Sequence, residues 1–220
     1  MNATLQPLTP IEARILGVLI EKSKTTPDVY PLTLNSLVAG CNQKTSRDPV
    51  LNLSEAEIQS ELEELRHRAL VLETYGASGR VLRYAHNFGR VYNLPSASVA
   101  LLAVLMLRGP QTVSELRANS ERLHHFADAS AVEGYLEELA GLDSGAQVVK
   151  LAKQPGSREH RWAHLLCGDV VETARPDQST EPRMANAEIE ERVSKLEQEV
   201  AELRAALAGL TARLGGGEQE

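Results

Sequence analysis

The chain has 220 residues, a formal net charge of −7 and 42% hydrophobic residues, which is ordinary for one or two domains with apolar cores. No apolar run reaches the roughly 18 residues that span a bilayer, and the N-terminus lacks the basic-then-apolar pattern of a secretory signal. We therefore expect a cytoplasmic protein that does not bind a membrane. Two cysteines are too few for a disulfide framework or a Cys-rich zinc site, so both are expected to be small buried hydrophobes.

The negative charge is concentrated at the C-terminus. Lys plus Arg against Asp plus Glu number 10 against 10 in residues 1–95, 7 against 8 in 96–168, and 6 against 12 in 169–220. The first 168 residues are therefore near neutral, and as a body they are neither repelled nor strongly attracted by nucleic acid.

Two helices are predicted before residue 41. Thr9 is placed to cap the first helix and Pro10 to begin it, and the apolar residues Ile11, Ile15, Val18 and Leu19 lie on one face. Thr26-Pro27-Asp28 ends this helix. The second helix is short, with Thr33 as its N-cap and an end near Gly40.

A third helix and a hairpin follow. Ser54 and Glu57 form a capping box, and the spacing of Ile58, Leu62, Leu65 and Ala69 predicts an amphipathic helix from Leu53 to Leu72. Residues 71–75 and 81–88 are rich in β-branched and aromatic side chains, and the glycine turn 76–79 separates them. Helix, turn, helix, strand, turn, strand is the order of a winged helix-turn-helix, with the Ser54 helix in the place of the recognition helix.

The same order returns downstream, which indicates a duplicated domain. Residues 15–20 match 101–106, and residues 31–37 match 110–116, at offsets of 86 and 79. Residues 58–65 match 132–139, and residues 83–86 match 161–164, at offsets of 74 and 78. The offsets differ only where loops would change length, so we expect winged-helix domains at 1–93 and 94–168.

The remaining residues are expected to form a linker, a coiled-coil helix and a tail. Residues 169–185 contain two prolines and few large apolar groups, which is typical of a flexible linker. Residues 186–214 carry a heptad pattern with valine at a and leucine at d, which favours a parallel homodimer. The alternative is a single amphipathic helix packed on the domains. Residues 215–220 are expected to be a disordered tail. The apolar heptad positions are Ile189, Val193, Leu196, Val200, Leu203, Leu207, Leu210 and Leu214.

Four blocks of residues resemble the bacterial YceH family. They are Leu-Thr-Pro-Ile-Glu-Ala-Arg at 8–14, Cys-Asn-Gln-Lys-Thr-Ser-Arg-Asp-Pro at 41–49, Leu-Met-Leu-Arg-Gly-Pro-Gln-Thr at 105–112, and Ser-Glu-Arg-Leu at 120–123. The resemblance covers residues 8–168 and implies two tandem winged-helix domains, in agreement with the internal repeat. It implies no activity, substrate or set of site residues. The expected fold is therefore α+β and mainly helical, with two tandem winged helix-turn-helix domains followed by a coiled-coil helix.

No sequence signature of catalysis, of a cofactor or of a metal site is present, so we expect a protein that is not an enzyme. His160, His164 and Cys167 come nearest to a metal set, because a strand would place the two histidines on one face. His164 has the repeat mate His86, however, and no second histidine lies four residues before His86. A structural role shared by both copies is the better interpretation.

Nucleic-acid binding is the first functional hypothesis, although the predicted recognition helix suits it poorly. Its outward face would carry Ala56, Ser60, Glu63, Glu64 and His67, and carboxylates meet the phosphate field of DNA unfavourably. Glu137 and Glu138 take the matching places in the second copy. Candidate nucleic-acid contacts therefore lie in the turn before the helix and on the two hairpins. They are Gln43, Lys44, Thr45, Ser46, Arg47, Arg80, Arg83, Lys150, Lys153, Arg158 and Arg161.

Two functions follow from these patterns. The first is a dimeric protein that binds duplex DNA in a regulatory or chromosome-associated role. The alternative is an adaptor whose acidic helix faces and coiled coil bind protein partners.

Overall fold

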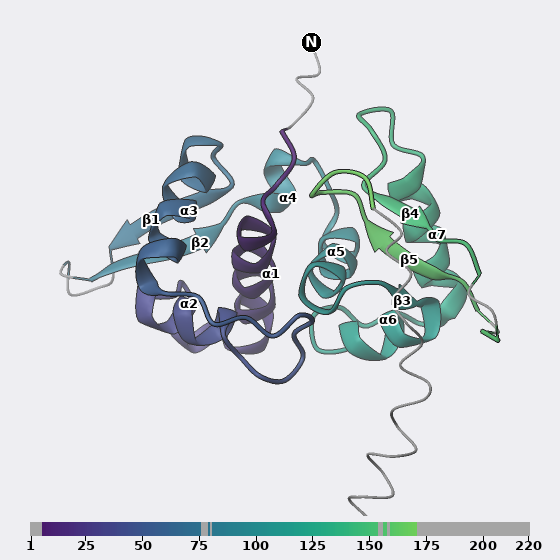
Figure 1. The fold of residues 1–220 in the computed structure, drawn as a ribbon, viewed down its shortest axis with the longest axis horizontal. Coiled ribbons are helices and arrows are strands. Elements are labelled where there is room, and N and C mark those ends of the chain that lie inside the picture. The colour runs from purple at the N-terminus through teal and green to yellow at the C-terminus, as the bar shows by residue number, and fades with distance from the viewer. Residues whose placement is uncertain (1–5, 76–78, 80, 154–155, 158, 171–220) are drawn as a thin grey trace, which may run out of the picture. The chain divides into compact units, whose positions relative to one another are not determined.

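The computed structural model describes residues 6–75, 79, 81–153, 156–157 and 159–170, all of which fall within one of the chain's two units, residues 1–170 (Figure 1). The described residues have an α+β fold that is mainly helical with two small sheets, which confirms the expected class. The predicted coiled coil, the tail and all of the predicted linker beyond Val170 lie outside the described residues. None of the described helices has both the length and the apolarity that crossing a bilayer requires.

The first half of the unit contains three helices and a hairpin. The helices are α1 (Pro10–Thr25), α2 (Leu34–Cys41) and α3 (Glu55–His67), with the 3-10 turn η1 (Pro27–Val29) between the first two. The strands are β1 (Val71–Tyr75) and β2 (Leu82–His86). Thr9, Thr33 and Ser54 cap the three helices as predicted, and each hydroxyl accepts a hydrogen bond from the main-chain N–H three residues later. The short helix α4 (Phe88–Val91) leads into the second half.

The second half repeats this order of elements. It consists of α5 (Ser96–Arg108), β3 (Gln111–Thr112), α6 (Val113–Ser120), α7 (Ala129–Ala140), β4 (Val148–Lys150) and β5 (Arg161–His164). The four matched sequence blocks lie on corresponding elements: α1 and α5, the starts of α2 and α6, α3 and α7, and β2 and β5. The internal repeat of the sequence is therefore also a repeat of secondary structure.

Each half has a small antiparallel sheet with the same arrangement. β1 pairs with β2, with Glu73 opposite Tyr84, and Leu32 forms a bridge to Tyr84 from the other side. In the second half the order is β3-β5-β4, so β3 takes the place of the Leu32 bridge. β1 and β4 are therefore the outer strands of their sheets.

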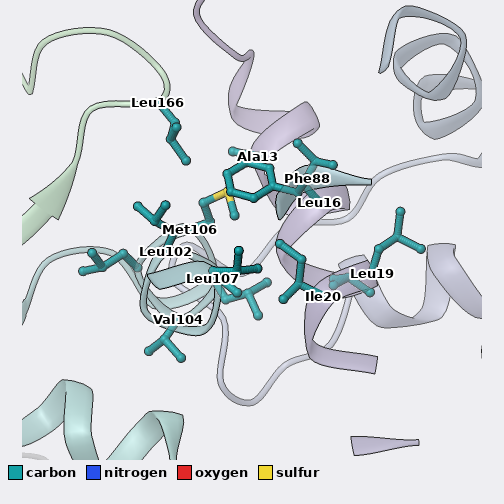
Figure 2. Close-up of a cluster of buried hydrophobic side chains, with 14 of the residues drawn as sticks. Ala13, Leu16, Leu19, Ile20, Phe88, Leu102, Val104, Met106, Leu107 and Leu166 are labelled. Atoms are coloured by element: carbon teal, nitrogen blue, oxygen red, sulfur yellow. The ribbon is translucent and has the colours of Figure 1, made fainter. Parts of the chain in front are cut away.

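The core is centred on α1 and α5, which pack against each other (Figure 1). Residues 12–20 of α1 and 97–107 of α5 are all buried, whereas the sequence predicted one apolar face for the first helix. The difference arises because α1 also contacts α2, α3 and β2. Figure 2 shows Leu16 and Ile20 of α1 in one cluster with Leu107 of α5. A Cβ on Gly17 would lie 2.9 Å from the Leu107 Cγ, so glycine permits this close approach.

Two predicted boundaries were wrong. α3 ends at His67 rather than Leu72, and Ala69 is exposed with a φ of 57°. The chain turns there to enter β1, and Leu70 takes the buried place that was expected for Ala69. The second strand ends at His86, because Phe88 belongs to α4 and is buried. Cys41 is buried as expected, but Cys167 is exposed in the turn after β5.

Candidate functional site

Residues 42–53, which we call the linking segment, join α2 to α3 and are held by buried groups. Arg14 of α1 is 2% exposed, and it donates hydrogen bonds to the carbonyl oxygens of Cys41 at 3.1 Å and Pro49 at 2.6 Å. Asn42 closes the segment, because its side chain donates to the Leu53 carbonyl at 2.8 Å and accepts from the Leu53 N–H at 2.7 Å. Hydrogen bonds to Arg14 and within the segment thus hold its conformation.

Arg47 points into the protein rather than toward solvent. Its side chain has 0% exposure, and its Nη2 lies 2.7 Å from Oε2 of Glu21 on α1. Its Nε donates to the Gly40 carbonyl at 3.1 Å, and Nη2 also donates to the Gln43 Oε1 at 2.9 Å. Burial disfavours the charge of Glu21, but the hydrogen bonds and charges of Arg47 and Lys22 together outweigh burial and lower the pKa of that carboxyl. Both Arg47 and Gln43 are therefore engaged inside the protein.

The linking segment also contacts the C-terminal end of α5. The Arg108 Nη2 donates to the Ser46 Oγ at 2.7 Å, and the Asp48 N–H donates to the Leu107 carbonyl at 2.8 Å. Ser46 has a φ of 60°, a left-handed conformation that is uncommon outside glycine. Of the five candidates in this turn, Lys44 and Thr45 have exposed side chains. The segment that was expected to bind phosphate also joins the two halves.

Sequence reasoning missed the three residues that hold this segment, Arg14, Glu21 and Arg108. Arg14 and Glu21 lie at the two ends of the apolar run of α1. A charge next to or within a predicted buried run needs a partner, and that requirement was the available signal.

The arginines of the two hairpins make matching internal contacts. The Arg83 Nη1 donates to the Pro31 carbonyl at 2.7 Å, and the Arg161 Nη1 donates to the Pro110 carbonyl at 3.3 Å. Because Arg83 matches Arg161 and Pro31 matches Pro110 in the internal repeat, this contact is part of the repeated fold. Arg161 also lies 3.7 Å from Glu115.

The lysines of the second hairpin are exposed. Lys150 lies 3.1 Å from the Glu133 Oε1 and 5.5 Å from the centroid of the Trp162 ring, and Lys153 is exposed as well. The remaining two hairpin candidates, Arg80 and Arg158, lie outside the described residues.

The outward face of α3 is acidic. Ile58, Leu62 and Leu65 point into the core, as predicted. The exposed side chains that we call the acidic face of α3 are Glu55, Ala56, Glu57, Gln59, Ser60, Glu63, Glu64 and His67. Arg66 is the exposed cation of this helix, and its Nη1 lies 3.7 Å from Glu73 of β1. The matched residues Glu137 and Glu138 of α7 are exposed too, so both helices present carboxylates to solvent.

The repeat mates His86 and His164 are desolvated in both halves. Burial lowers the pKa of each to about 4, with a further contribution from Lys24 for His86. The His86 Nε2 lies 3.3 Å from the Ser23 Oγ, and the main-chain N–H of His86 donates to the Tyr30 hydroxyl at 2.7 Å. Among the described residues there is no group of three or more His, Cys, Asp or Glu side chains that could hold a metal ion. Burial therefore favours the neutral form of both imidazoles.

Comparison with known proteins places this chain among bacterial relatives. The model of a family described as "Protein of unknown function, DUF480" matches residues 8–157. A UPF0502 protein of Leptothrix cholodnii is 54% identical over 207 residues, which cover 94% of this chain and 92% of the relative. A UPF0502 protein of Acidovorax sp. strain JS42 is 52% identical over 220 residues and 97% of each chain. A UPF0502 protein of Burkholderia ambifaria is 56% identical over 175 residues, with 79% and 73% of the two chains covered. The chain therefore belongs to the DUF480 family, which includes these UPF0502 proteins.

Proposed function

We propose that this chain is a tandem winged-helix protein without enzymatic activity, and that it works as an adaptor that binds other proteins through the acidic face of α3. The winged-helix assignment is supported by the repeated order of three helices and a hairpin. It is supported further by the strand pairing of β2 and β5 with the residues that precede the second helix of each half. The resemblance of residues 8–168 to the YceH family implies the same architecture.

The single observation that carries the adaptor proposal is the chemistry of α3. In a winged helix this helix would enter the major groove, but here its exposed side includes Glu55, Glu57, Glu63 and Glu64. Each carboxylate placed near DNA phosphates opposes binding, whereas the same carboxylates attract lysine and arginine side chains of a protein. Two candidate phosphate contacts, Arg47 and Arg83, are bonded internally instead.

A crossed pair of charge reversals tests this proposal. The first variant, Glu63→Lys with Glu64→Lys, changes the acidic face of α3. The second, Lys44→Glu with Lys153→Glu, changes exposed cations elsewhere. Proteins captured from the native cell are quantified by mass spectrometry, and affinity for a random duplex is measured at low salt by fluorescence anisotropy.

We expect the first variant to lose its specific protein partners by at least about tenfold, with duplex affinity unchanged or increased. The second variant should keep these partners. Partners that are retained by the α3 variant and lost by the Lys44 and Lys153 variant would contradict the proposal. Thermal unfolding of both variants shows whether the fold is intact.

Duplex DNA is the second candidate partner, in a regulatory or chromosome-associated role. Lys44, Thr45, Lys150 and Lys153 are exposed in the turn and on the second hairpin, which are places where winged-helix proteins contact phosphate. Binding through such contacts weakens steeply with salt and hardly depends on sequence. In the crossed experiment this function predicts that the Lys44 and Lys153 variant, and not the α3 variant, loses its partner.

We further propose that the heptad pattern of residues 186–214, which lie outside the described residues, forms a parallel homodimer. Deletion of residues 186–220 should then halve the mass measured by light scattering. An unchanged mass would favour the single amphipathic helix instead.

A further inference from the structure

We propose that the outer edge of β1 is a docking site for an extended peptide of a protein partner, with basic and apolar residues in alternation, which adds to the sheet as a further strand. The proposal rests on the adaptor function and specifies how the partner binds. Strand addition is a common mode of peptide recognition, because main-chain hydrogen bonds give affinity and alternate side chains give specificity.

The register of the first sheet identifies which main-chain groups of β1 face outward. The Asn87 N–H donates to the Leu70 carbonyl, so residues 70 and 87 form a hydrogen-bonded pair. Such pairs recur at every second residue of an antiparallel ladder, so 72 with 85 and 74 with 83 are hydrogen-bonded pairs too. The alternate residues Glu73 and Tyr75 therefore direct their N–H and carbonyl groups away from β2. On the opposite strand, Tyr84 uses its outward groups to pair with Leu32. Within the described residues, no main-chain group pairs with the outward edge of Glu73 or Tyr75.

The second half of the protein provides an internal comparison. We call its outer strand β4 blunted, because it is short and carries a cation. β4 has three residues against five in β1, and its outward position Lys150 carries a cation. Short outer strands and lysine are the devices by which proteins prevent unwanted strand pairing. β1 is longer, and two of its side chains are apolar or aromatic and exposed, since Leu72 is 49% exposed and Tyr75 is 69% exposed. Its outward position Glu73, which matches Lys150, carries the opposite charge. Among the described residues, one repeat thus has a short outer strand with a cation, and the other has a longer outer strand with a carboxylate.

The side chains on the two faces of β1 define the chemistry of the occupant. Glu73 lies on the α3 side, where its carboxylate is 3.7 Å from the Nη1 of Arg66. Burial and the charges of Glu73 and Glu63 raise the pKa of Tyr84, whereas the charge of Arg66 acts to lower it, so two carboxylates and one guanidinium lie near that ring. A strand added beside β1 would place every second side chain near these carboxylates. The intervening side chains would lie on the other face, beside Leu72 and Thr74. Lysine or arginine alternating with valine or leucine fits both faces.

The probe is a ten-residue peptide of alternating lysine and valine with blocked termini, added to the full chain labelled with ¹⁵N. Amide hydrogen exchange is followed residue by residue. With peptide at about ten times its Kd, exchange at Glu73 and Tyr75 should slow by about tenfold. Leu72 and Thr74, whose N–H groups already face β2, should not change, and neither should Lys150 in the blunted strand.

Three matched controls separate the possible outcomes. A peptide of alternating glutamate and valine tests charge, and a lysine-valine peptide with two central valines replaced by proline tests strand pairing. Glu73→Lys places on β1 the cation that Lys150 places on β4, at an exposed position where it also removes the ion pair with Arg66. Each control should abolish the slowed exchange at Tyr75.

Binding that shifts only the resonances of α3, without slower exchange at Glu73 and Tyr75, would overturn strand addition while leaving the adaptor function in place. Equal protection by a random duplex would overturn the peptide as occupant. If the edge is protected by the peptide but the α3 charge reversals leave all cellular partners bound, the adaptor function through the acidic face fails separately.

Discussion

Arg47 is a structural residue whose loss should unfold the linking segment. Arg47→Ala would remove the guanidinium beside Glu21, whose side chain is 16% exposed and also lies 3.4 Å from the Lys22 Nζ. Removing one partner of a buried ion pair costs up to about 3–5 kcal/mol. We expect the free energy of unfolding, measured by urea denaturation, to fall by roughly that amount.

Lys44→Ala is the matched control, because Lys44 is exposed three residues earlier in the same turn. Its effect should stay within about 0.5 kcal/mol. Equal effects of the two substitutions would contradict the structural role of Arg47.

The buried histidines make stability sensitive to mild acid. In the unfolded chain each imidazole has a pKa near 6.5, whereas in the folded protein the pKa of His86 and of His164 is about 4. Between these values the unfolded chain binds protons that the folded protein does not, so stability is complete above pH 6.5 and declines as the pH falls toward 4. Each unit of difference corresponds to about 1.4 kcal/mol. Urea denaturation at pH 7.5 and pH 5 measures the loss.

Carboxylates also titrate in this range, so the test compares variants. His86→Phe with His164→Phe should remove the part of the pH dependence between 6.5 and 5 that belongs to the histidines. An identical slope in the parent and the double variant would show that the histidines do not cause it.

At the scale of elements, glycines mark where helices approach closely. A Cβ on Gly40 of α2 would lie 2.6 Å from the Cγ1 of Val18 on α1. Because the χ1 angle of valine is restricted, the Val18 side chain cannot easily rotate to make room. Gly40→Ala should therefore destabilise the protein by about 1–3 kcal/mol, despite the better helix propensity of alanine.

Gly134 in α7 is the control, because a Cβ there would meet nothing within 4 Å. Gly134→Ala should raise the free energy of unfolding by up to about 1 kcal/mol. Thermal melts of the two variants should thus move in opposite directions. A melting temperature for Gly40→Ala at or above that of the parent would show that α1 and α2 can separate without cost.

The elements were predictable because their signals are local. Thr9, Ser54 and the 3.6-residue spacing after Ser54 depend on neighbours within a few residues, and the internal repeat fixed the order of elements in the second half. The environment of Arg47 could not be predicted, because its partner Glu21 lies 26 residues away, on α1. The sequence of this turn indicates a solvated basic loop, whereas in the fold its Arg47 forms a buried ion pair with Glu21.

At the scale of the described unit, the two halves share one core and several connections. α1 packs on α5, and the linking segment reaches α5 through Asp48 and Leu107. The N–H of Leu8 also donates to the carbonyl of Leu166 at 2.7 Å, which ties the start of the first half to the end of the second. The two halves of a duplicated sequence are therefore joined through their first helices.

Because the two halves share one core, we expect the first half to be unstable when it is separated from the second. A fragment of residues 1–93 would expose Leu16 and Ile20 of α1, which cluster with Leu107 of α5 in Figure 2 and are at most 1% exposed. Exposing one such side chain costs about 1.5–3 kcal/mol, so losing several consumes most of the 5–15 kcal/mol that stabilises a typical domain. We expect residues 1–170 to unfold in one transition and residues 1–93 to aggregate or unfold, as measured by light scattering and amide NMR spectra. A monomeric 1–93 fragment with dispersed resonances and cooperative unfolding would instead establish the predicted boundary at 93 as that of an autonomous domain.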